Sequence, residues 1–443
     1  MARLQSRQIS QLHLYQLLHG MRLARVPMSR SQIAEMTGLS QPAVSSLTRR
    51  LLDSGALHEV GARPSAGGGR RERELALNPD HAWVVGAKLS LHQMAISLTD
   101  FAGGMRHTVK LPLAAPMSAK TLVKVLTRRI EAFLDEAGPS VRARLAGIAI
   151  ALPGFIDSMH GVVHWSAVLT GGRGHHDVPL AQALKDAIGV PVLIENDANM
   201  LAMAEQWFGE AARLSNVAVV TLEHGLGLGL VLNGELYRGH AGLAAELAHL
   251  QIDPAGRACR CGKQGCLETL VTHDALVREA EAAGLLPAGA GAGSFESQVA
   301  SFATLVARAE RGERRARAIF ERQGRVLGQW LGNVVNLLAP QLVILDGGSM
   351  VAADLYEKPL REAMDAAMVL PHRGQVRLLL RHCGDEAWAR GAASLVLQRL
   401  DESAQIVESV ARHGVEQEAA GPRPALNEVP LAGGSLAPAR FAN

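Results

Sequence analysis

Apolar and polar positions alternate with two different periods along the chain, and the change of period predicts where strands and helices lie. The stretches WVVGAKL, QMAISLTD and MRHTVKLP predict strands, followed by a helix from about Lys120 to Glu136 and another strand, LAGIAIAL. A similar series begins at NVAVVTLE, continues through GLGLVLN, and later reaches the helical LGQWLGNVVNLL and the strand LVILDGG. Because the second series resembles the first, the pattern predicts two related α/β lobes with a ligand-binding cleft between them.

The N-terminal segment carries the start and stop signals of two short helices separated by a tight turn. Ser29 is placed to cap the first helix, and Gly38 is placed to end it. Ser40 can cap the second helix, whose first turn contains Pro42. Two capped helices at this spacing predict a helix-turn-helix.

The second of these helices is predicted to be amphipathic. Val44, Leu47 and Leu51 recur at spacings of three and four residues and therefore share one apolar face. The polar face is expected to enter a DNA major groove, where Gln and Ser can bond base edges or phosphates and Arg can bond phosphates. The helix residues expected to contact DNA are Gln41, Ser45, Ser46, Arg49 and Arg50.

The stretch LHEVGARPSAGGGRRERELAL follows, and it predicts two short strands around a glycine-rich tip, a wing bearing Arg63, Arg70 and Arg71. Charge favours DNA binding at this end, since residues 1–80 contain 11 Arg, no Lys and 6 acidic residues while the whole chain carries only +3. The alternative is a helical protein-interaction module with solvated arginines. A DNA-binding winged helix-turn-helix is expected to work as a dimer that reads two half-sites of a double-stranded operator.

Length and composition set the domain plan. A chain of 443 residues exceeds one ordinary core. Its 48% hydrophobic and 20% charged residues are typical of a soluble globular protein, and the lack of a long apolar run predicts a cytoplasmic protein without membrane insertion. We expect a DNA-binding domain at 1–78 and a two-lobed domain at 79–400, followed at 401–443 by a disordered tail. The lobes are placed at about 79–200 and 201–380, with the last helix returning to the first lobe.

Three of the four cysteines crowd into eight residues, which indicates a metal site in a reducing compartment rather than a disulfide framework. These three, in a C-x-C-x4-C spacing with two glycines, are Cys259, Cys261 and Cys266. His249 is chosen as the fourth ligand, with Cys383 and His240 as the other candidates. Three thiolates and an imidazole suit a closed, structural Zn²⁺ site, and the alternative is free buried cysteines.

With these features named, the chain resembles the ROK family of sugar-responsive repressors and sugar kinases, and within it the NagC/Mlc/XylR-type repressor branch. The resemblance covers about residues 10 to 400, and its most specific segment is HLQIDPAGRACRCGKQGCLET. It implies that an actin-like (ribonuclease-H-like) two-lobed domain of the sugar-kinase type follows the winged helix-turn-helix. Dimerisation is expected mainly through this larger domain, as a homodimer or a dimer of dimers.

The resemblance also implies a sugar pocket. The residues that match the family's sugar contacts are Asn196, Asp197, Glu246, His249 and Glu268. Carboxylates and amides can pair with vicinal hydroxyls, and His249 can bind zinc through one ring nitrogen while the other faces the ligand. In the kinases the aspartate at the position of Asp197 is the general base.

The nucleotide side departs from the kinase pattern. Where kinases carry a DxGGTK-like phosphate loop, this chain has VVGAKLS, without the acid and the paired glycines. The second phosphate loop, GTGxGxG in kinases, is EHGLGLGL, with His224 replacing the hydroxyl residue. A PNLPGW-like segment is replaced by HWSAVLTGGRGHH, in which Ser166 is a candidate substitute for the sugar-contacting asparagine. Asp197 is therefore predicted to be a vestigial base in a protein that is not an enzyme.

These features together predict a DNA-binding repressor of carbohydrate uptake or catabolism genes. A sugar or sugar derivative bound in the kinase-like domain would control it without phosphoryl transfer. One alternative is an ATP-dependent sugar kinase with an appended DNA-binding module. The other is a regulator controlled by a protein partner.

Overall fold

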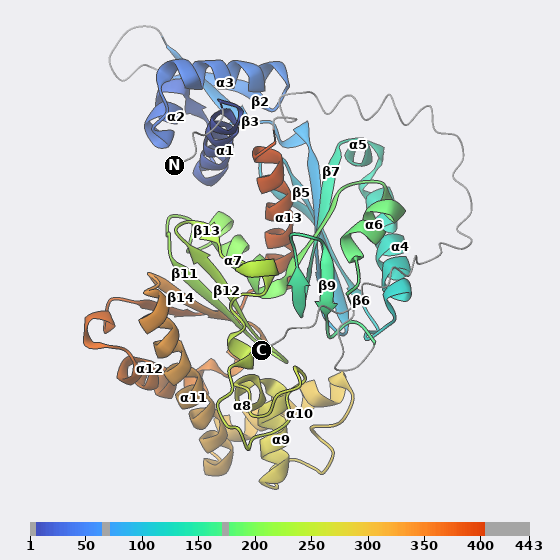
Figure 1. The fold of residues 1–443 in the computed structure, drawn as a ribbon, viewed down its shortest axis with the longest axis vertical. Helices are drawn as coiled ribbons and strands as arrows, with labels where there is room; N and C mark the ends of the chain where they lie inside the picture. The colour runs from blue at the N-terminus through green and yellow to red at the C-terminus, as the bar shows by residue number, and fades with distance from the viewer. Residues whose placement is uncertain (1–5, 64–70, 171–176, 404–443) are drawn as a thin grey trace, which may run out of the picture.

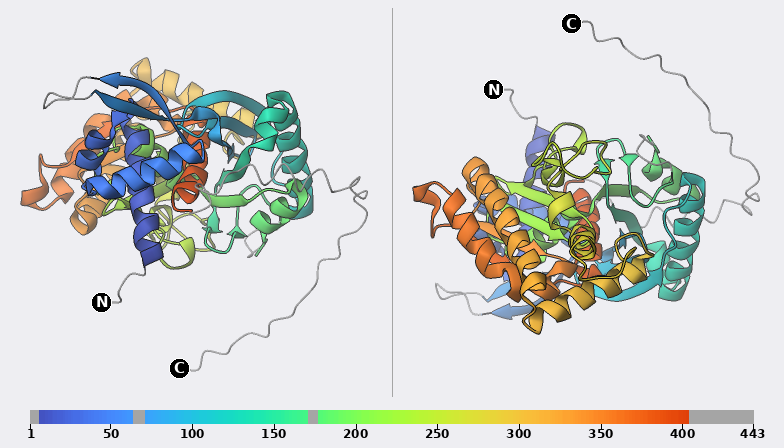
Figure 2. Two further views of the ribbon diagram at one scale, coloured as in Figure 1. Left: turned by 90° about the horizontal axis from the view of Figure 1, so that it is seen from above. Right: turned by 90° about the horizontal axis from the view of Figure 1, so that it is seen from below.

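The computed structural model describes residues 6–63, 71–170 and 177–403. Figure 1 shows an N-terminal module above two α/β lobes, and Figure 2 shows the same arrangement from above and below. Arg70 of the predicted wing and the predicted tail from residue 404 onward lie outside the described residues.

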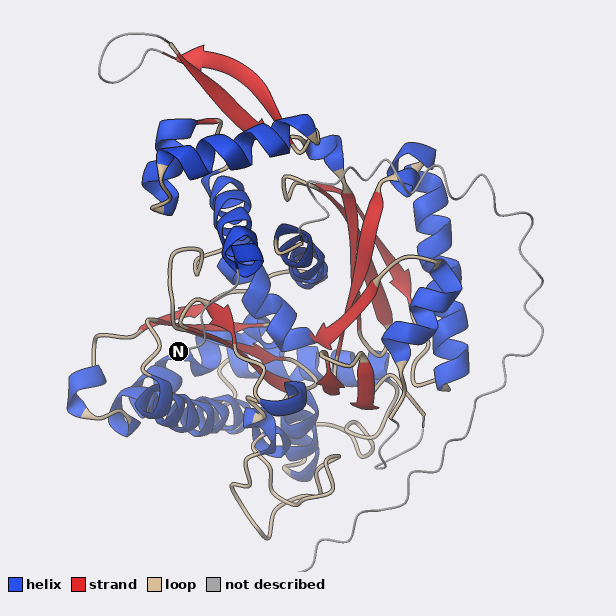
Figure 3. Cartoon of the chain, turned by 45° about the horizontal axis from the view of Figure 1, so that its top comes forward, coloured by secondary structure: helices blue, strands red, loops and turns tan. Residues whose placement is uncertain are grey.

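The N-terminal module, residues 6–78, is a helix-turn-helix followed by a hairpin that projects from it (Figure 3). Its three strands form a sheet in the order β1-β3-β2, with β3 antiparallel to both neighbours. The elements are α1 (Ser6–Ala24), β1 (Met28–Ser29), α2 (Arg30–Thr37), α3 (Gln41–Asp53), β2 (Leu57–Arg63) and β3 (Glu72–Leu77).

The predicted caps of the helix-turn-helix are confirmed. The Ser29 side chain and Gln32 form a reciprocal capping box at the start of α2, and Gly38 ends α2 with a φ of 71°. The hydroxyl of Ser40 accepts a hydrogen bond from the backbone N–H of Ala43 at the start of α3. Figure 1 shows α3 along the outer side of the module.

The first lobe is built on a five-stranded sheet in the order β10-β7-β4-β5-β6. Helices α4 and α6 share one apolar core with this sheet. The strands are β4 (Trp83–Leu89), β5 (Gln93–Asp100), β6 (Met105–Pro112), β7 (Leu145–Leu152) and β10 (Val192–Asn196). The other elements are α4 (Ala119–Ala137), α5 (Pro139–Ala143), β8 (Phe155–Asp157), β9 (Val162–Trp165) and α6 (Leu180–Ile188).

The second lobe repeats this plan with the sheet order β13-β12-β11-β14-β15. In chain order, the first strand of each sheet (β4 or β11) pairs antiparallel with the second (β5 or β12) and parallel with the fourth (β7 or β14). This shared pairing confirms the predicted two related lobes. Its strands are β11 (Val217–Leu222), β12 (Leu226–Leu232), β13 (Glu235–Leu236), β14 (Leu342–Asp346) and β15 (Arg377–Leu380). Its helices are α8 (Glu268–Val271), α9 (His273–Ala282), α10 (Phe295–Glu310), α11 (Arg314–Leu338) and α12 (Ala353–Ala367).

Two helices, α7 (Asp197–Phe208) and α13 (Asp385–Asp401), pack against each other between the lobes. The last helix, α13, also lies on β4, β5 and β7 of the first lobe (Figure 1). Gly86 makes this close approach possible, because a Cβ atom there would lie 1.8 Å from the carbonyl oxygen of Ala389. The same core includes apolar residues of α1, so the N-terminal module packs on this side of the first lobe.

Candidate functional site

A cavity of about 490 Å³ lies between the lobes, and side chains of both lobes line it. The structure brings all of the predicted sugar-contacting residues into its wall. They are Asn196, Asp197, Glu246, His249 and Glu268. The outermost of them, Asn196 and Glu268, are 72 residues apart in the chain.

Asn196 and Asp197 lie where β10 ends and α7 begins. The Asn196 side chain caps α7, since its oxygen accepts hydrogen bonds from the N–H groups of Ala198 and Asn199, and its amide donates to the Gly154 carbonyl at 3.0 Å. The helix N-terminus thus fixes both side chains at the cavity. Burial raises the pKa of Asp197, while the nearby Lys88 ammonium acts to lower it.

Glu246 and Glu268 add two more carboxylates to the same wall. Burial raises the pKa of Glu246 to about 7, and the neighbouring carboxylates of Glu268 and Asp197 contribute to the rise. Glu268 starts α8 and is 7% exposed. Carboxylates in this cavity wall are suited to accept hydrogen bonds from the vicinal hydroxyls of a sugar.

His249 connects the cavity with a cysteine cluster. It ends a short 3₁₀ turn, Leu247–His249. Its Nε2 lies 3.9 Å from a Glu246 oxygen at the cavity, and its Nδ1 lies 3.5 Å from the sulfur of Cys259. Nδ1 also lies 3.9 Å from an oxygen of Glu268, and that carboxylate accepts a hydrogen bond from the Cys259 thiol at 2.9 Å, so His249 and Glu268 both lie between the cavity and the cysteine cluster.

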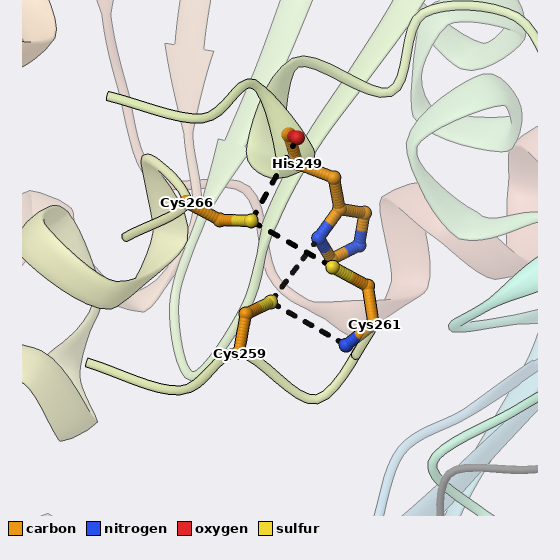
Figure 4. A group of neighbouring side chains, drawn as sticks. All are labelled: His249, Cys259, Cys261 and Cys266. Carbon is orange, nitrogen blue, oxygen red and sulfur yellow. Dashed lines mark hydrogen bonds between the residues drawn. The ribbon is translucent and has the colours of Figure 1, made fainter. Parts of the chain in front are cut away.

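The cysteine cluster has the size of a tetrahedral metal site (Figure 4). The ligand atoms of His249, Cys259, Cys261 and Cys266 all lie within 4.8 Å of one another, and the Cys261 and Cys266 sulfurs are 3.6 Å apart. Tetrahedral zinc sets sulfurs about 3.8 Å from each other and about 3.6 Å from a nitrogen ligand. Burial raises the pKa of the Cys259 and Cys266 thiols, so a bound cation would have to supply the charge that stabilises thiolates. These four residues can hold a metal ion.

Aromatic side chains complete the cavity wall, and no sequence pattern singled them out. The rings of Phe155 and Trp165 lie 5.7 Å apart, and Phe155 also packs edge-on against His249 at 5.4 Å. Aromatic faces of this kind suit the apolar C–H face of a sugar ring. The suggested role of Ser166 is not supported, because it is 1% exposed and its hydroxyl donates to the Pro153 carbonyl instead of facing the cavity.

Comparison with known proteins identifies the family of this chain. The ROK family profile matches residues 84–399. The chain belongs to the ROK family.

Among curated ROK proteins, the chain is 30% identical over 344 residues to the Escherichia coli "DNA-binding transcriptional dual regulator NagC". That match covers 76% of this chain and 80% of the regulator. The chain is 28% identical to the Bacillus subtilis xylose repressor, over 85% of this chain and 92% of the repressor.

Two solved ROK structures have a fold similar to that of this chain. A ROK family transcriptional regulator described as a homolog of the Escherichia coli Mlc protein matches with a TM-score of 0.72 and 24% identity, over 90% of this chain and all of the other. A ROK glucokinase from Streptomyces griseus matches with a TM-score of 0.59 and 27% identity, over 71% of this chain and 99% of the kinase. The predicted fold class is confirmed, and the match to the regulator extends over more of this chain than the match to the kinase.

The helix-turn-helix of this ROK chain presents most of the predicted DNA contacts to solvent. Val44, Leu47 and Leu51 of α3 are buried, as predicted. On its other faces Gln41, Ser46, Arg49 and Arg50 are exposed, and Ser45 is partly exposed. In the wing, Arg63 ends β2 and Arg71 is exposed next to β3. In the described part of the chain, no helix is long and apolar enough to cross a membrane.

Proposed function

We propose that this ROK protein is a DNA-binding repressor of carbohydrate uptake or catabolism genes whose DNA affinity is set by a sugar or sugar derivative. Relatives named as a transcriptional regulator and a xylose repressor support the regulatory role. The exposed polar face of α3 and the projecting hairpin support DNA binding, with the arginines on phosphates. A homodimer or a dimer of dimers would supply the second half-site.

The observation that carries the sugar proposal is the convergence of Asn196, Asp197, Glu246, His249 and Glu268 on one cavity. The amide and carboxylates would bind sugar hydroxyls, and Phe155 and Trp165 would cover an apolar face of the ring. Strand β4 brings Lys88 to this cavity from the segment in which ROK kinases carry an acid and paired glycines. Without a phosphate loop, Asp197 has no positioned phosphoryl donor to work with, and the protein would bind without phosphoryl transfer.

The metal in this proposal is a structural Zn²⁺ held by His249, Cys259, Cys261 and Cys266. A closed set of four ligands leaves no open position for chemistry on the metal. It would fix the ring of His249 so that Nε2 faces the sugar, and would hold the loop that precedes Glu268.

Two helices would connect the cavity to the N-terminal module. α7 begins at Asp197 in the cavity wall, and near its other end the Trp207 ring lies 4.6 Å from the His19 ring of α1. α13 begins at Asp385, also in the wall, and ends at Asp401, which pairs with Arg22 of α1. A sugar that favours one arrangement of the lobes would therefore move the surfaces on which the module sits.

The test is a thermal-shift screen of the full chain against hexoses, pentoses, amino sugars and their phosphates, followed by gel shifts of the gene's own promoter with each hit. A sugar that raises the melting temperature and changes the gel shift supports the proposal. ATP-dependent phosphorylation of any hexose that Asp197→Asn abolishes would overturn the absence of phosphoryl transfer. A promoter shift that no sugar alters would favour control by a protein partner instead.

A further inference from the structure

Lys88 places a buried ammonium at the junction of the two lobes. The residue is 4% exposed, and its Nζ lies 2.7 Å from an oxygen of Asp385 and 3.9 Å from an oxygen of Glu223. Nζ also lies 3.8 Å from the centre of the Trp388 ring. An ammonium removed from water to this extent needs such partners to stay charged.

The partners of Lys88 come from separate parts of the fold. Lys88 belongs to β4 in the first lobe, Glu223 directly follows β11 in the second lobe, and Asp385 begins α13. Each carboxylate is fixed by a second contact. Glu223 accepts a hydrogen bond from the backbone N–H of Gly348 at 3.0 Å, and Asp385 accepts one from the side-chain amide of Gln93. The ammonium therefore links both lobes and the helix between them.

The surrounding charge is negative. Burial acts to lower the pKa of Lys88, but the carboxylates of Glu223, Asp385 and Asp197 outweigh this effect and raise it. Without the ammonium these three carboxylates would repel one another at the edge of the sugar cavity. Carboxylates gathered in this way form an environment that suits a divalent cation. Here a covalently attached cation occupies the same kind of environment.

From this geometry we infer that Lys88 is a positioning residue, a built-in counter-ion that joins the two lobes beside the sugar cavity. Its charge holds Glu223 of the second lobe and Asp385 of α13 against β4, and so holds the lobes at the spacing that the sugar requires. The inference rests on the proposed sugar-binding function and deepens it.

The experiment replaces the attached cation with a free one. Lys88→Ala in the full chain should leave a void beside the carboxylates of Glu223 and Asp385, and carboxylate oxygens are the ligands that Mg²⁺ and Mn²⁺ prefer. We expect the sugar hit from the screen to bind Lys88→Ala about tenfold or more weakly, the range of a typical coupling between sites. Millimolar MgCl₂ should restore part of this loss. The sugar affinity of the unmodified chain should respond neither to MgCl₂ nor to ATP.

A matched control is Lys358→Ala, which removes a lysine whose side chain is 86% exposed on α12. It should leave both sugar affinity and its metal response unchanged. Lys88→Arg, which keeps the charge, should bind sugar more tightly than Lys88→Ala. If Lys88→Ala fails to fold, the comparison of Lys88→Arg with Lys88→Met provides the same test of charge.

A readout that does not involve sugar separates this inference from the proposed function. Mn²⁺ binding, followed by its electron paramagnetic resonance signal, should show one more site in Lys88→Ala than in the unmodified chain. If no sugar binds any variant but the extra Mn²⁺ site is present, the proposed function fails and the counter-ion role stands. If Lys88→Ala binds sugar as tightly as the unmodified chain, or gains no divalent-metal site, the counter-ion role is overturned.

Discussion

Replacing Asp401 with Asn should loosen the attachment of the N-terminal module to the sugar-binding domain. Asp401 ends α13, and its carboxylate pairs with the Arg22 guanidinium of α1 through two hydrogen bonds. The side chains are 1% and 0% exposed for Arg22 and Asp401. Arg22 also donates to the Phe101 carbonyl at 3.0 and 3.2 Å and lies over the Phe101 and Trp207 rings. Asp401→Asn keeps the shape and removes the carboxylate that pairs with this buried cation.

The expected loss of unfolding free energy follows from the burial of this ion pair. Removing one partner of a buried ion pair costs about 3–5 kcal/mol, because the other charge stays buried without compensation. The Phe101 carbonyl remains as an acceptor for Arg22, so we expect the lower end, about 3 kcal/mol. The expected loss for an exposed pair is at most about 0.5 kcal/mol. Arg325→Met, which breaks an exposed pair with Glu321 on α11, is therefore the matched control.

The assay combines urea unfolding with operator binding measured by fluorescence anisotropy, with and without sugar. Burial raises the pKa of Asp401 to about 6 against the opposing effect of Arg22, so the measurements belong at pH 8, where the carboxylate is ionised. Asp401→Asn, Arg22→Met and the double variant form a cycle, and the double variant should lose less than the sum of the two single losses. The sugar response of operator binding should shrink in each single variant. A loss no larger than that of Arg325→Met, together with a full sugar response, would refute this reasoning.

The remaining predictions concern DNA, metal and pH. Arg49→Ala with Arg50→Ala should weaken operator binding and reduce the slope of log affinity against log salt by about 2, because each phosphate contact contributes about 0.9. Cys261→Ser should lower the bound zinc in elemental analysis and lower the melting temperature, because a structural metal contributes folding free energy. Burial and the nearby Arg22 lower the pKa of His19 to about 4, so its contribution to stability is present above pH 6.5 and is lost as pH falls toward 4. Between pH 7.5 and 5 the loss of this His19 contribution should lower the free energy of unfolding, measured with urea, by about 2 kcal/mol.

Each of these predictions has its own control. Exposed Arg314 at the start of α11 lies in the second lobe, and Arg314→Ala should leave the salt slope unchanged. Cys383→Ser should keep its zinc, since Cys383 lies outside the four-ligand cluster. His19→Gln should reduce the pH dependence. Full operator affinity without the two arginines, unchanged zinc in Cys261→Ser, or an unchanged pH profile in His19→Gln would each contradict the corresponding assignment.

Local patterns predicted local structure well. The stretches WVVGAKL, QMAISLTD, MRHTVKLP and LAGIAIAL became β4, β5, β6 and β7 with the predicted bounds. Strands β4, β5 and β7 are mostly buried and carry the apolar residues that a buried strand needs, whereas β6 is the more exposed edge strand. The helix caps at Ser29, Gly38 and Ser40 were also predictable, since a cap depends on residues within one turn. The cysteine cluster was identified from spacing alone, and the structure brings its ligand atoms together.

Contacts between distant segments were not predictable from the pattern. Lys88 and Asp385 are 297 residues apart, and Arg22 and Asp401 are 379 residues apart, so no period or spacing connects them. The predicted start of the tail at residue 401 illustrates the difficulty, since polarity favoured a boundary there while the structure buries Asp401 against α1. The position of Phe155 in the cavity wall was not predicted, for the same reason. A single aromatic residue at the start of a three-residue strand gives no recognisable pattern in the sequence.

The most direct test of sugar control is one titration of the full chain on labelled operator DNA, measured by anisotropy with each sugar hit while ATP consumption is followed in the same sample. We expect at least one sugar to change the operator dissociation constant by about tenfold, which is within the usual range of coupling between sites. We also expect that no ATP is consumed. An operator affinity that no sugar changes, or sugar-dependent ATP consumption, would contradict this account.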